Sequence, residues 1–146
     1  MLTHALLAVE KEEEKEYDVI VMLQPTSPFR RAEHVWKTVK KLVDSGCDSV
    51  LTVSETDSKN HPLKQLLIDG DRIDYYDKAG KHIIARQQLK PVYHRNGVAY
   101  AVTRECLLVQ KTTIGRVALA VVVTDPIVNI DTPWDMQFAQ WMLSQK

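Results

Sequence analysis

The first residues of this 146-residue chain that could do chemistry lie in a stiff turn at positions 23–30, which read Leu-Gln-Pro-Thr-Ser-Pro-Phe-Arg. Two prolines restrict the backbone, Gln24 carries an amide that can donate and accept hydrogen bonds, and Thr26 and Ser27 add hydroxyl groups. The turn follows an apolar run at 19–23, and ligands of open α/β sheets bind at the carboxyl ends of strands. These residues are therefore candidate ligand contacts. The alternative is a rigid strand-to-helix turn in which Thr26 and Ser27 bond only to nearby backbone.

A second cluster of polar side chains, residues 86–97, brings three cations and three amides into twelve positions ahead of an apolar run. Arg86 can hold a carboxylate through two parallel hydrogen bonds, whereas Lys90 supplies only a point charge. An anionic sugar or a phosphate is the natural ligand for such a segment. The alternative is a solvated loop whose charges have no ligand.

A third pair of polar residues, Asn129 and Asp131, occupies alternate positions of an extended segment just before an expected helix. Alternation places both side chains on the same side of that segment. Two oxygen ligands suit Mg²⁺, which takes one or two carboxylates together with phosphate oxygens and water. The competing role for Asp131 is to cap the helix.

The same sequence argues against several other kinds of site. Its five glycines, at 46, 70, 80, 97 and 115, form no Gly-rich loop ahead of a helix, so nothing is built to cradle a triphosphate. The five histidines follow no zinc-binding pattern, and Ser27 lacks the Gly-x-Ser-x-Gly elbow of a serine hydrolase. Basic and acidic residues are equal in number, 19 each, which argues against a protein that coats nucleic acid.

Composition indicates one globular domain in the cytoplasm. With 45% hydrophobic and 26% charged residues, a chain of this length can bury a single core. No apolar stretch approaches the roughly 18 residues that span a bilayer, and the first residues do not resemble a secretory signal. Cys47 and Cys106 are therefore expected to be reduced, buried thiols.

The elements that must position the three clusters alternate between helix and strand. Apolar periodicity predicts an amphipathic helix from Leu2 into the charged stretch at 10–16, and a central, parallel strand at 19–23. A second helix ends at Gly46 and a strand follows at 49–53, which makes a right-handed βαβ unit. The expected apolar face of the second helix comprises Val35, Trp36, Val39, Leu42 and Val43.

Polar residues and turn signals interrupt this α/β pattern between about 55 and 95. Apolar residues at 66–68 and 73–76 flank a turn that contains Gly70, which predicts a hairpin. Strands return at 97–102 and 117–123. A last helix is expected after the N-cap Thr132, with Pro133 and Asp135 in its first turn and an apolar face of Trp134, Phe138, Trp141 and Met142.

Together the three clusters resemble the acylneuraminate cytidylyltransferase family, the CMP-sialic acid synthetases and their relatives. Residues 23–30 resemble that family's strand-end motif. The sequence Arg-Gln-Gln-Leu from Arg86, with Arg95-Asn96-Gly97, resembles its sugar-acid segment. Ile130-Asp131-Thr132-Pro133 with Asp135 resembles its closing metal-binding motif. The similarity covers essentially the whole chain, with the three motifs in the family's order.

The resemblance implies a three-layer α/β fold of the nucleotide-diphospho-sugar-transferase type, which is a Rossmann-like mixed sheet. Residues 1–146 would form one partial domain without the family's N-terminal CTP-binding segment, and the insertion at about 55–95, with its β-hairpin, would serve dimerisation. A homodimer in the cytoplasm, with no nucleic-acid or membrane partner, is the assembly expected on this basis.

The resemblance also implies a reaction, in which CTP condenses with a nine-carbon sugar acid to give a CMP-sugar and pyrophosphate, with Mg²⁺ as cofactor. The catalytic residues that it implies are Arg86 and Asp131, and the metal would be held by Asp131 and Asn129. The residues that it implies for substrate binding are Gln24, Thr26, Ser27, Arg86, Gln87, Tyr93 and Asn96.

Two departures from the family pattern leave the enzymatic status open. The chain lacks the Gly/Arg/Lys-bearing loop that binds CTP in the family, and Asn129 stands where the family typically carries an aspartate. An amide oxygen is a neutral and weaker Mg²⁺ ligand than a carboxylate. The chain is therefore either the sugar-acid-binding and dimerisation part of a cytidylyltransferase, or a non-catalytic remnant that acts as a sugar-acid-binding or dimerisation module.

Overall fold

The computed structural model describes residues 1–145, which divide into two compact units. Unit 1 comprises Met1–Val53 with the chain from Arg95 onward, and unit 2 is Ser54–His94. Each unit is described below by itself. None of the helices within residues 1–145 is long and apolar enough to cross a membrane.

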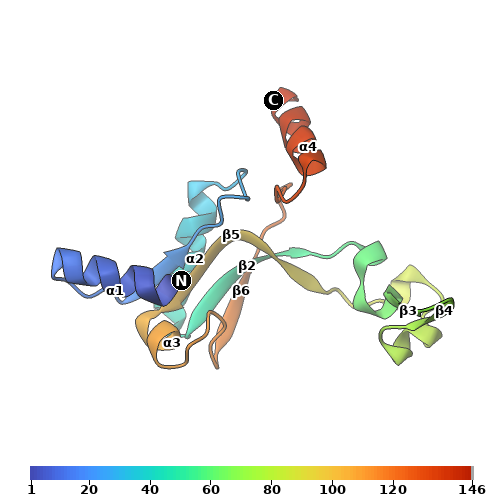
Figure 1. The fold of residues 1–146 in the computed structure, drawn as a ribbon, viewed down its shortest axis with the longest axis horizontal. Coiled ribbons are helices and arrows are strands. Elements are labelled where there is room, and N and C mark those ends of the chain that lie inside the picture. Colours follow the sequence, from blue (N-terminus) through green and yellow to red (C-terminus); the bar gives the residue numbers. More distant parts are fainter. Residues whose placement is uncertain (146) are drawn as a thin grey trace. The chain divides into compact units, whose positions relative to one another are not determined.

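Unit 1 is built on a four-stranded mixed sheet in the order β1-β5-β2-β6 (Figure 1). Its strands are β1 (Val19–Met22), β2 (Ser49–Glu55), β5 (Tyr93–Thr103) and β6 (Ala118–Val122), of which β2 and β5 run on into unit 2. The pairing of β1 with β5 is antiparallel, and that of β2 with β6 is parallel. These observations confirm the α/β class and the mixed sheet.

The expectation that β1 is a central, parallel strand was wrong. In the described sheet β1 lies at the edge and pairs only with the antiparallel β5, from Val19 opposite Thr103 to Met22 opposite Tyr100. The continuous apolar run in β1 reflects two covered faces rather than two neighbouring strands. Val19 and Val21 pack on one side of the sheet, whereas Ile20 packs on the other.

Helices cover both faces of the sheet, which makes three layers. On one face α2 (Ala32–Ser45) places Leu42 against Val50 and Ala101. On the other face α1 (Leu2–Glu13) and α3 (Arg104–Leu108) place Leu6 and Leu107 against Val102. The expected end of α2 is confirmed, because Gly46 adopts the left-handed conformation, with a φ of 63°.

The buried face of α2 differs from the apolar face that the sequence predicts. Trp36 and Val43 are 61% and 65% exposed, whereas the buried positions are His34, Thr38 and Leu42, four residues apart. Two of these three side chains are polar, so the periodicity of apolar residues does not reveal the buried face of α2. Thr38 Oγ1 donates to the His34 carbonyl at 2.7 Å, which lets a hydroxyl be buried there without an unpaired donor.

Unit 2 contains the expected hairpin, which is formed by β3 (Leu66–Asp69) and β4 (Arg72–Tyr75). Gly70 turns between the strands at a φ of 59°. Four short 3-10 helices surround the hairpin along the chain, namely η1 (Ser58–Asn60), η2 (Pro62–Lys64), η3 (Lys78–His82) and η4 (Arg86–Gln88). The apolar hairpin side chains Leu67, Ile68 and Ile73 are exposed, so unit 2 buries little apolar surface of its own.

The last helix, α4 (Pro133–Ser144), begins as expected. Thr132 Oγ1 accepts from the Asp135 N–H at 3.3 Å, and Asp135 Oδ2 accepts from the Thr132 N–H at 2.7 Å. This reciprocal capping box satisfies two donors at the helix start. Trp134, Phe138 and Trp141 share one face of the helix as expected, and all three are exposed, whereas Ala139 is buried.

Candidate functional site

A buried polar network lies at the carboxyl end of β1, centred on Ser27, which is 0% exposed. Ser27 Oγ donates toward Asn129 Oδ1 at 2.5 Å and toward the Asn96 carbonyl at 3.0 Å. The Ile130 N–H donates to the Thr26 carbonyl at 2.8 Å, which fastens the same two segments through the backbone. The 23–30 turn is thus held against both β5 and the segment ahead of α4.

Asn96 extends this network into the middle of the sheet. Its side-chain Oδ1 accepts from Thr52 Oγ1 at 2.6 Å and from the Val98 N–H at 3.2 Å. Thr52 Oγ1 in turn accepts from the Ala99 N–H at 2.9 Å, and the Thr103 N–H donates to the Asp48 carbonyl at 3.0 Å. Because the later residue of β2 thus meets the earlier residue of β5, the two strands run antiparallel. Among the described residues no buried side-chain nitrogen or oxygen lacks a hydrogen-bond partner.

Gly97 allows the turn to approach β5 closely. Its φ is +71°, and a Cβ added there would lie 2.2 Å from Gln24 Oε1 and 2.6 Å from Ser27 Oγ. The Gly97 carbonyl accepts from the Gln24 N–H at 3.3 Å. A residue without a side chain is therefore needed both for the backbone conformation and for the space.

Arg30 clamps the turn from its other end. Its Nη2 donates to the Gln24 carbonyl at 2.5 Å, and its Nε donates to the Val98 carbonyl. Both bonds go from a guanidinium to backbone oxygens, so the cation is committed to holding the turn. Arg30 closes the sequence motif at 23–30, but sequence reasoning gave it no role, and it also missed Thr52.

The structure brings together five of the sequence-predicted site residues in unit 1, namely Gln24, Thr26, Ser27, Asn96 and Asn129. Arg86, Gln87 and Tyr93 lie in unit 2, where all three are exposed. Arg86 starts η4 and lines a small hollow of about 80 Å³ with His61 and Lys90. No ion-pair partner of Arg86 occurs within residues 1–145.

Asp131 and its neighbours supply few oxygen ligands for Mg²⁺. Asp131 is exposed, and its carboxylate does not cap α4, because Thr132 occupies the N-cap position. The Asn129 oxygen already accepts from Ser27. Bonds from Thr132 and Asp131 lower the pKa of Asp135, whose carboxylate is committed to the helix cap. Within residues 1–145 no group of three His, Cys, Asp or Glu side chains could hold a metal ion. Asp131 is thus the one carboxylate here that is free to join phosphate oxygens and water around Mg²⁺.

A second polar cluster, which sequence reasoning missed, joins α2 to the segment after β6. His34 is 4% exposed, its Nε2 lies 2.8 Å from Asp125 Oδ2, and its Nδ1 accepts from the Arg31 N–H at 3.2 Å. Arg31 also pairs with Asp125. Because both ring nitrogens of His34 are engaged, the cluster fastens the segment that carries Asn129 and offers no free base.

The pKa of Asp125 should make the protein's stability depend on pH. The hydrogen bond from His34 and the charge of Arg31 hold the pKa of the Asp125 carboxyl below its ordinary value of 3.8. A carboxyl with a lowered pKa in the folded state stabilises the protein above its unfolded pKa, and that contribution is lost as the pH falls through the folded value. The stability advantage of the wild type over Asp125→Asn is therefore expected to shrink below about pH 4.

Urea unfolding curves at several pH values between about 6 and 3 would measure this difference. Asp71→Asn is the matched control, because Asp71 is exposed in the β3–β4 turn and has no ion-pair partner within residues 1–145. An Asp125→Asn curve that stays parallel to the wild type over the whole range would contradict the expected contribution.

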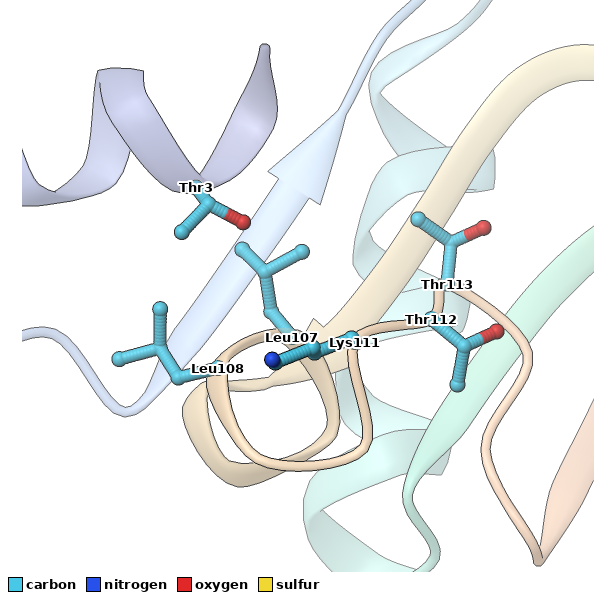
Figure 2. A pocket seen from close by; sticks show the side chains of 6 residues that line it. All are labelled: Thr3, Leu107, Leu108, Lys111, Thr112 and Thr113. Carbon is cyan, nitrogen blue, oxygen red and sulfur yellow. The ribbon is translucent and has the colours of Figure 1, made fainter.

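Unit 1 also contains a hollow of about 550 Å³ between α1 and the loop after α3, which Figure 2 shows from close by. Thr3 and Leu107 lie on the helices, whereas Lys111 and Thr112 belong to the loop. The Thr112 hydroxyl is already bonded to the backbone of Ile114. The lining has one cation, Lys111, and no carboxylate or imidazole among the described residues, so this hollow offers no set of metal ligands.

Comparison with known proteins identifies the fold first. CMP:2-keto-3-deoxy-manno-octonic acid synthetase, in a structure complexed with CTP, superposes with a TM-score of 0.61 over 99% of this chain and 68% of that chain, at 15% sequence identity. The chain therefore shares the α/β fold of that synthetase.

Sequence comparison then supports a particular relationship. N-acylneuraminate cytidylyltransferase from Streptococcus agalactiae serotype V is 30% identical over 94 residues, which are 63% of this chain and 22% of the relative. No protein-family profile matches the chain. The two similarities together support a relationship with the cytidylyltransferase family. The chain spans about a fifth of the length of the curated relative that it matches.

Proposed function

We propose that this chain is the sugar-acid-binding part of a cytidylyltransferase. The reaction is the transfer of a cytidylyl group from CTP to a nine-carbon sugar acid of the acylneuraminate type, with release of pyrophosphate. The observation that carries this proposal is the polar group at the carboxyl end of β1. There Ser27, Asn96 and Thr52 are buried and hydrogen-bonded to one another. The side-chain polar atoms of Gln24 and Thr26 have no hydrogen-bond partner within residues 1–145.

The chemistry of this group suits a neutral, hydroxyl-rich part of a ligand. An amide and a hydroxyl on a rigid turn can each donate and accept, which matches the pattern of a sugar. Arg30 uses two of its five N–H donors on backbone carbonyls, which fixes its guanidinium against the turn. A cation whose N–H donors are all available suits the carboxylate of the sugar acid better.

Arg86 is the residue that we propose for the carboxylate, with Gln87 and Tyr93 completing the substrate-binding set and the buried Asn96 supporting it through its bond with Thr52. The exposed guanidinium has no carboxylate partner within residues 1–145, so its two-pronged donor is available. Asp131 is proposed to hold Mg²⁺, with Asn129 as a weaker second oxygen. The metal would neutralise charge on the phosphates of CTP.

The proposed assembly is a homodimer in the cytoplasm, where CTP is available and Cys47 and Cys106 remain reduced.

One observation favours the alternative of a non-catalytic sugar-acid-binding module. The Asn129 oxygen is occupied by the Ser27 hydroxyl at 2.5 Å, which leaves Asp131 without a carboxylate companion. The two functions share the sugar-acid site and differ only in the transfer reaction.

Calorimetric titration with an acylneuraminate tests the shared site. Arg86→Lys keeps the charge but loses the planar fork, so the free energy of sugar-acid binding is expected to weaken by about 1–3 kcal/mol. Arg72→Lys is the matched control, because Arg72 is an exposed arginine in β4 and should leave binding unchanged. Unchanged affinity in Arg86→Lys would remove Arg86 from the site.

Pyrophosphate release and CTP binding, both measured on the wild-type chain, distinguish the enzyme from the non-catalytic module. Pyrophosphate release in the presence of CTP, Mg²⁺ and the sugar acid would support a transferase. Sugar-acid binding without pyrophosphate release, and without micromolar affinity for CTP, would support the module. Tight CTP binding with no affinity for the sugar acid would contradict the proposed function as a whole.

A further inference from the structure

Strand β6 lies at one edge of the sheet of unit 1 (Figure 1). It pairs in parallel with β2, and no other described strand lies against it. The Val117 carbonyl accepts from β2 and the Val123 N–H donates to β2. Because the direction of the backbone groups alternates along a strand, those that point away from β2 belong to Ala118, Ala120 and Val122.

This free edge has little of the protection that edge strands normally carry. Natural edges use charged side chains, prolines or bulges to prevent pairing with another chain. Residues 118–122 read Ala-Leu-Ala-Val-Val, without a charge or a proline. Leu119 and Val121 pack on the side of α2. The alternate side chains, which lie on the opposite face, are exposed, and Val122 is 49% accessible.

One side chain does occupy the edge, and it comes from α2. Lys41 Nζ donates to the Ala120 carbonyl at 2.8 Å. Lys41 has no carboxylate partner within residues 1–145. The ammonium is therefore held by a neutral oxygen, and a carboxylate that came within reach would attract it more strongly because it bears a full negative charge.

A hollow of about 340 Å³ runs along α2 from Lys41. The other side chains that line it are Trp36, Lys37, Lys40, Asp44 and Ser45. The Trp36 ring is 61% exposed. The two other lysines are already paired, Lys37 with Glu33 and Lys40 with Asp44. The edge of β6 is thus bordered by one available cation and an exposed aromatic ring.

We propose that the free edge of β6 binds an extended segment of another protein in which acidic and apolar residues alternate. The segment adds a strand to the sheet, so its backbone bonds to the outward groups of residues 118, 120 and 122. Its alternate side chains point to opposite faces. The acidic side chains face α2, where one carboxylate draws Lys41 away from the Ala120 carbonyl. The apolar side chains lie beside the exposed Val122 on the other face.

Lys41 selects for this kind of partner. A strand without acidic residues must displace the ammonium from the Ala120 carbonyl and offers no ion pair in return. Strand β6 is itself uncharged, so β6 of a second copy is disfavoured for the same reason. None of the residues at this edge belongs to the proposed sugar-acid site, so the two proposals can fail independently.

Fluorescence anisotropy of labelled hexapeptides tests the selection by charge. Glu-Val-Glu-Val-Glu-Val is expected to bind at least tenfold more tightly than Gln-Val-Gln-Val-Gln-Val. Added salt should reduce this difference, because it screens exposed charges. Equal affinity for the two peptides, or binding of neither, would overturn the proposal.

Lys41→Glu should weaken the binding of the acidic peptide at least tenfold. The matched control is Lys111→Glu, because Lys111 is another exposed lysine of unit 1 without a carboxylate partner within residues 1–145. This control should bind the acidic peptide as the wild type does. If the two variants bind it equally well, Lys41 does not select the partner and the proposal fails.

Ala120→Pro tests the addition of a strand. Proline is tolerated on an edge strand where the missing N–H would face solvent, so the circular dichroism of this variant should match the wild type. The edge loses one donor, and affinity for the acidic peptide should fall at least tenfold. Undiminished affinity in a folded Ala120→Pro would contradict the addition of a strand at β6.

Hydrogen exchange of the wild-type chain locates the peptide even if Ala120→Pro does not fold. The amides of Ala118, Ala120 and Val122 should become protected when the acidic peptide is added. Protection at β1 instead would overturn the proposal and place the added strand at the other edge of the described sheet. Protection of residues 118–122 at high protein concentration without peptide would also overturn it, because a second copy would then occupy the edge.

Discussion

Gly97→Ala is expected to destabilise unit 1 by about 2–4 kcal/mol, the largest effect of any single methyl group that we foresee. The left-handed backbone at Gly97 accounts for about 1 kcal/mol or slightly more of this cost. The remainder comes from the new Cβ, which would lie 2.6 Å from Ser27 Oγ and 2.2 Å from Gln24 Oε1. Gln24 can swing away, but Ser27 is fully buried and can move only by breaking its hydrogen bonds.

Urea unfolding of Gly97→Ala beside Gly70→Ala separates the two contributions. Gly70 has nearly the same conformation, with a φ of +59° against +71°, but a Cβ there meets nothing within 4 Å. Gly70→Ala should therefore show the backbone cost alone, about 1 kcal/mol. Equal destabilisation in the two variants would mean that the turn at 23–30 does not press against β5 in solution.

Ser27→Ala is expected to destabilise the protein by about 1–3 kcal/mol, because it leaves buried acceptors without a donor. Ser27 Oγ is the donor to Asn129 Oδ1 and to the Asn96 carbonyl, and alanine at 27 would supply none. The loss should also loosen the segment that carries Asp131. Affinity for the sugar acid should therefore fall together with stability.

The matched control for this substitution is Ser45→Ala. The Ser45 hydroxyl donates to the Lys41 carbonyl at 2.6 Å on the exposed end of α2, where water can replace it. Its removal should change the free energy of unfolding by no more than about 0.5 kcal/mol. If Ser27→Ala is as mild as Ser45→Ala, then water must reach the polar group at the carboxyl end of β1.

Much of the fold could be predicted from the sequence because its signals are local. The end of α2 at Gly46, the hairpin around Gly70 and the capping box at Thr132 each depend on a few neighbouring residues. The position of β1 at the sheet edge could not be predicted in this way. Its partner in the described sheet, β5, lies about eighty residues further along the chain, and no local pattern encodes that pairing.

The candidate site was predictable to a similar extent. The three polar clusters in the sequence led to Ser27, Asn96 and Asn129, and in the structure the Ser27 hydroxyl bonds to both of the other residues. Sequence reasoning missed His34 and Thr52 because it searched for apolar stripes, and both are buried polar residues whose partners are distant in sequence. Apolar periodicity placed Trp134, Phe138 and Trp141 on one face of α4, but it does not reveal whether a face is covered, and all three side chains are exposed.

The place of β5 between β1 and β2 also sets the order in which the molecule can assemble during synthesis. When a ribosome has made the chain only as far as residue 92, β1 and β2 both exist, but the strand that joins them has not been translated. The parallel partner of β2 comes later still, because β6 begins at Ala118. The nascent chain therefore keeps two unpaired apolar strands until unit 2 is complete, which is the condition in which chaperones bind and in which incomplete chains aggregate.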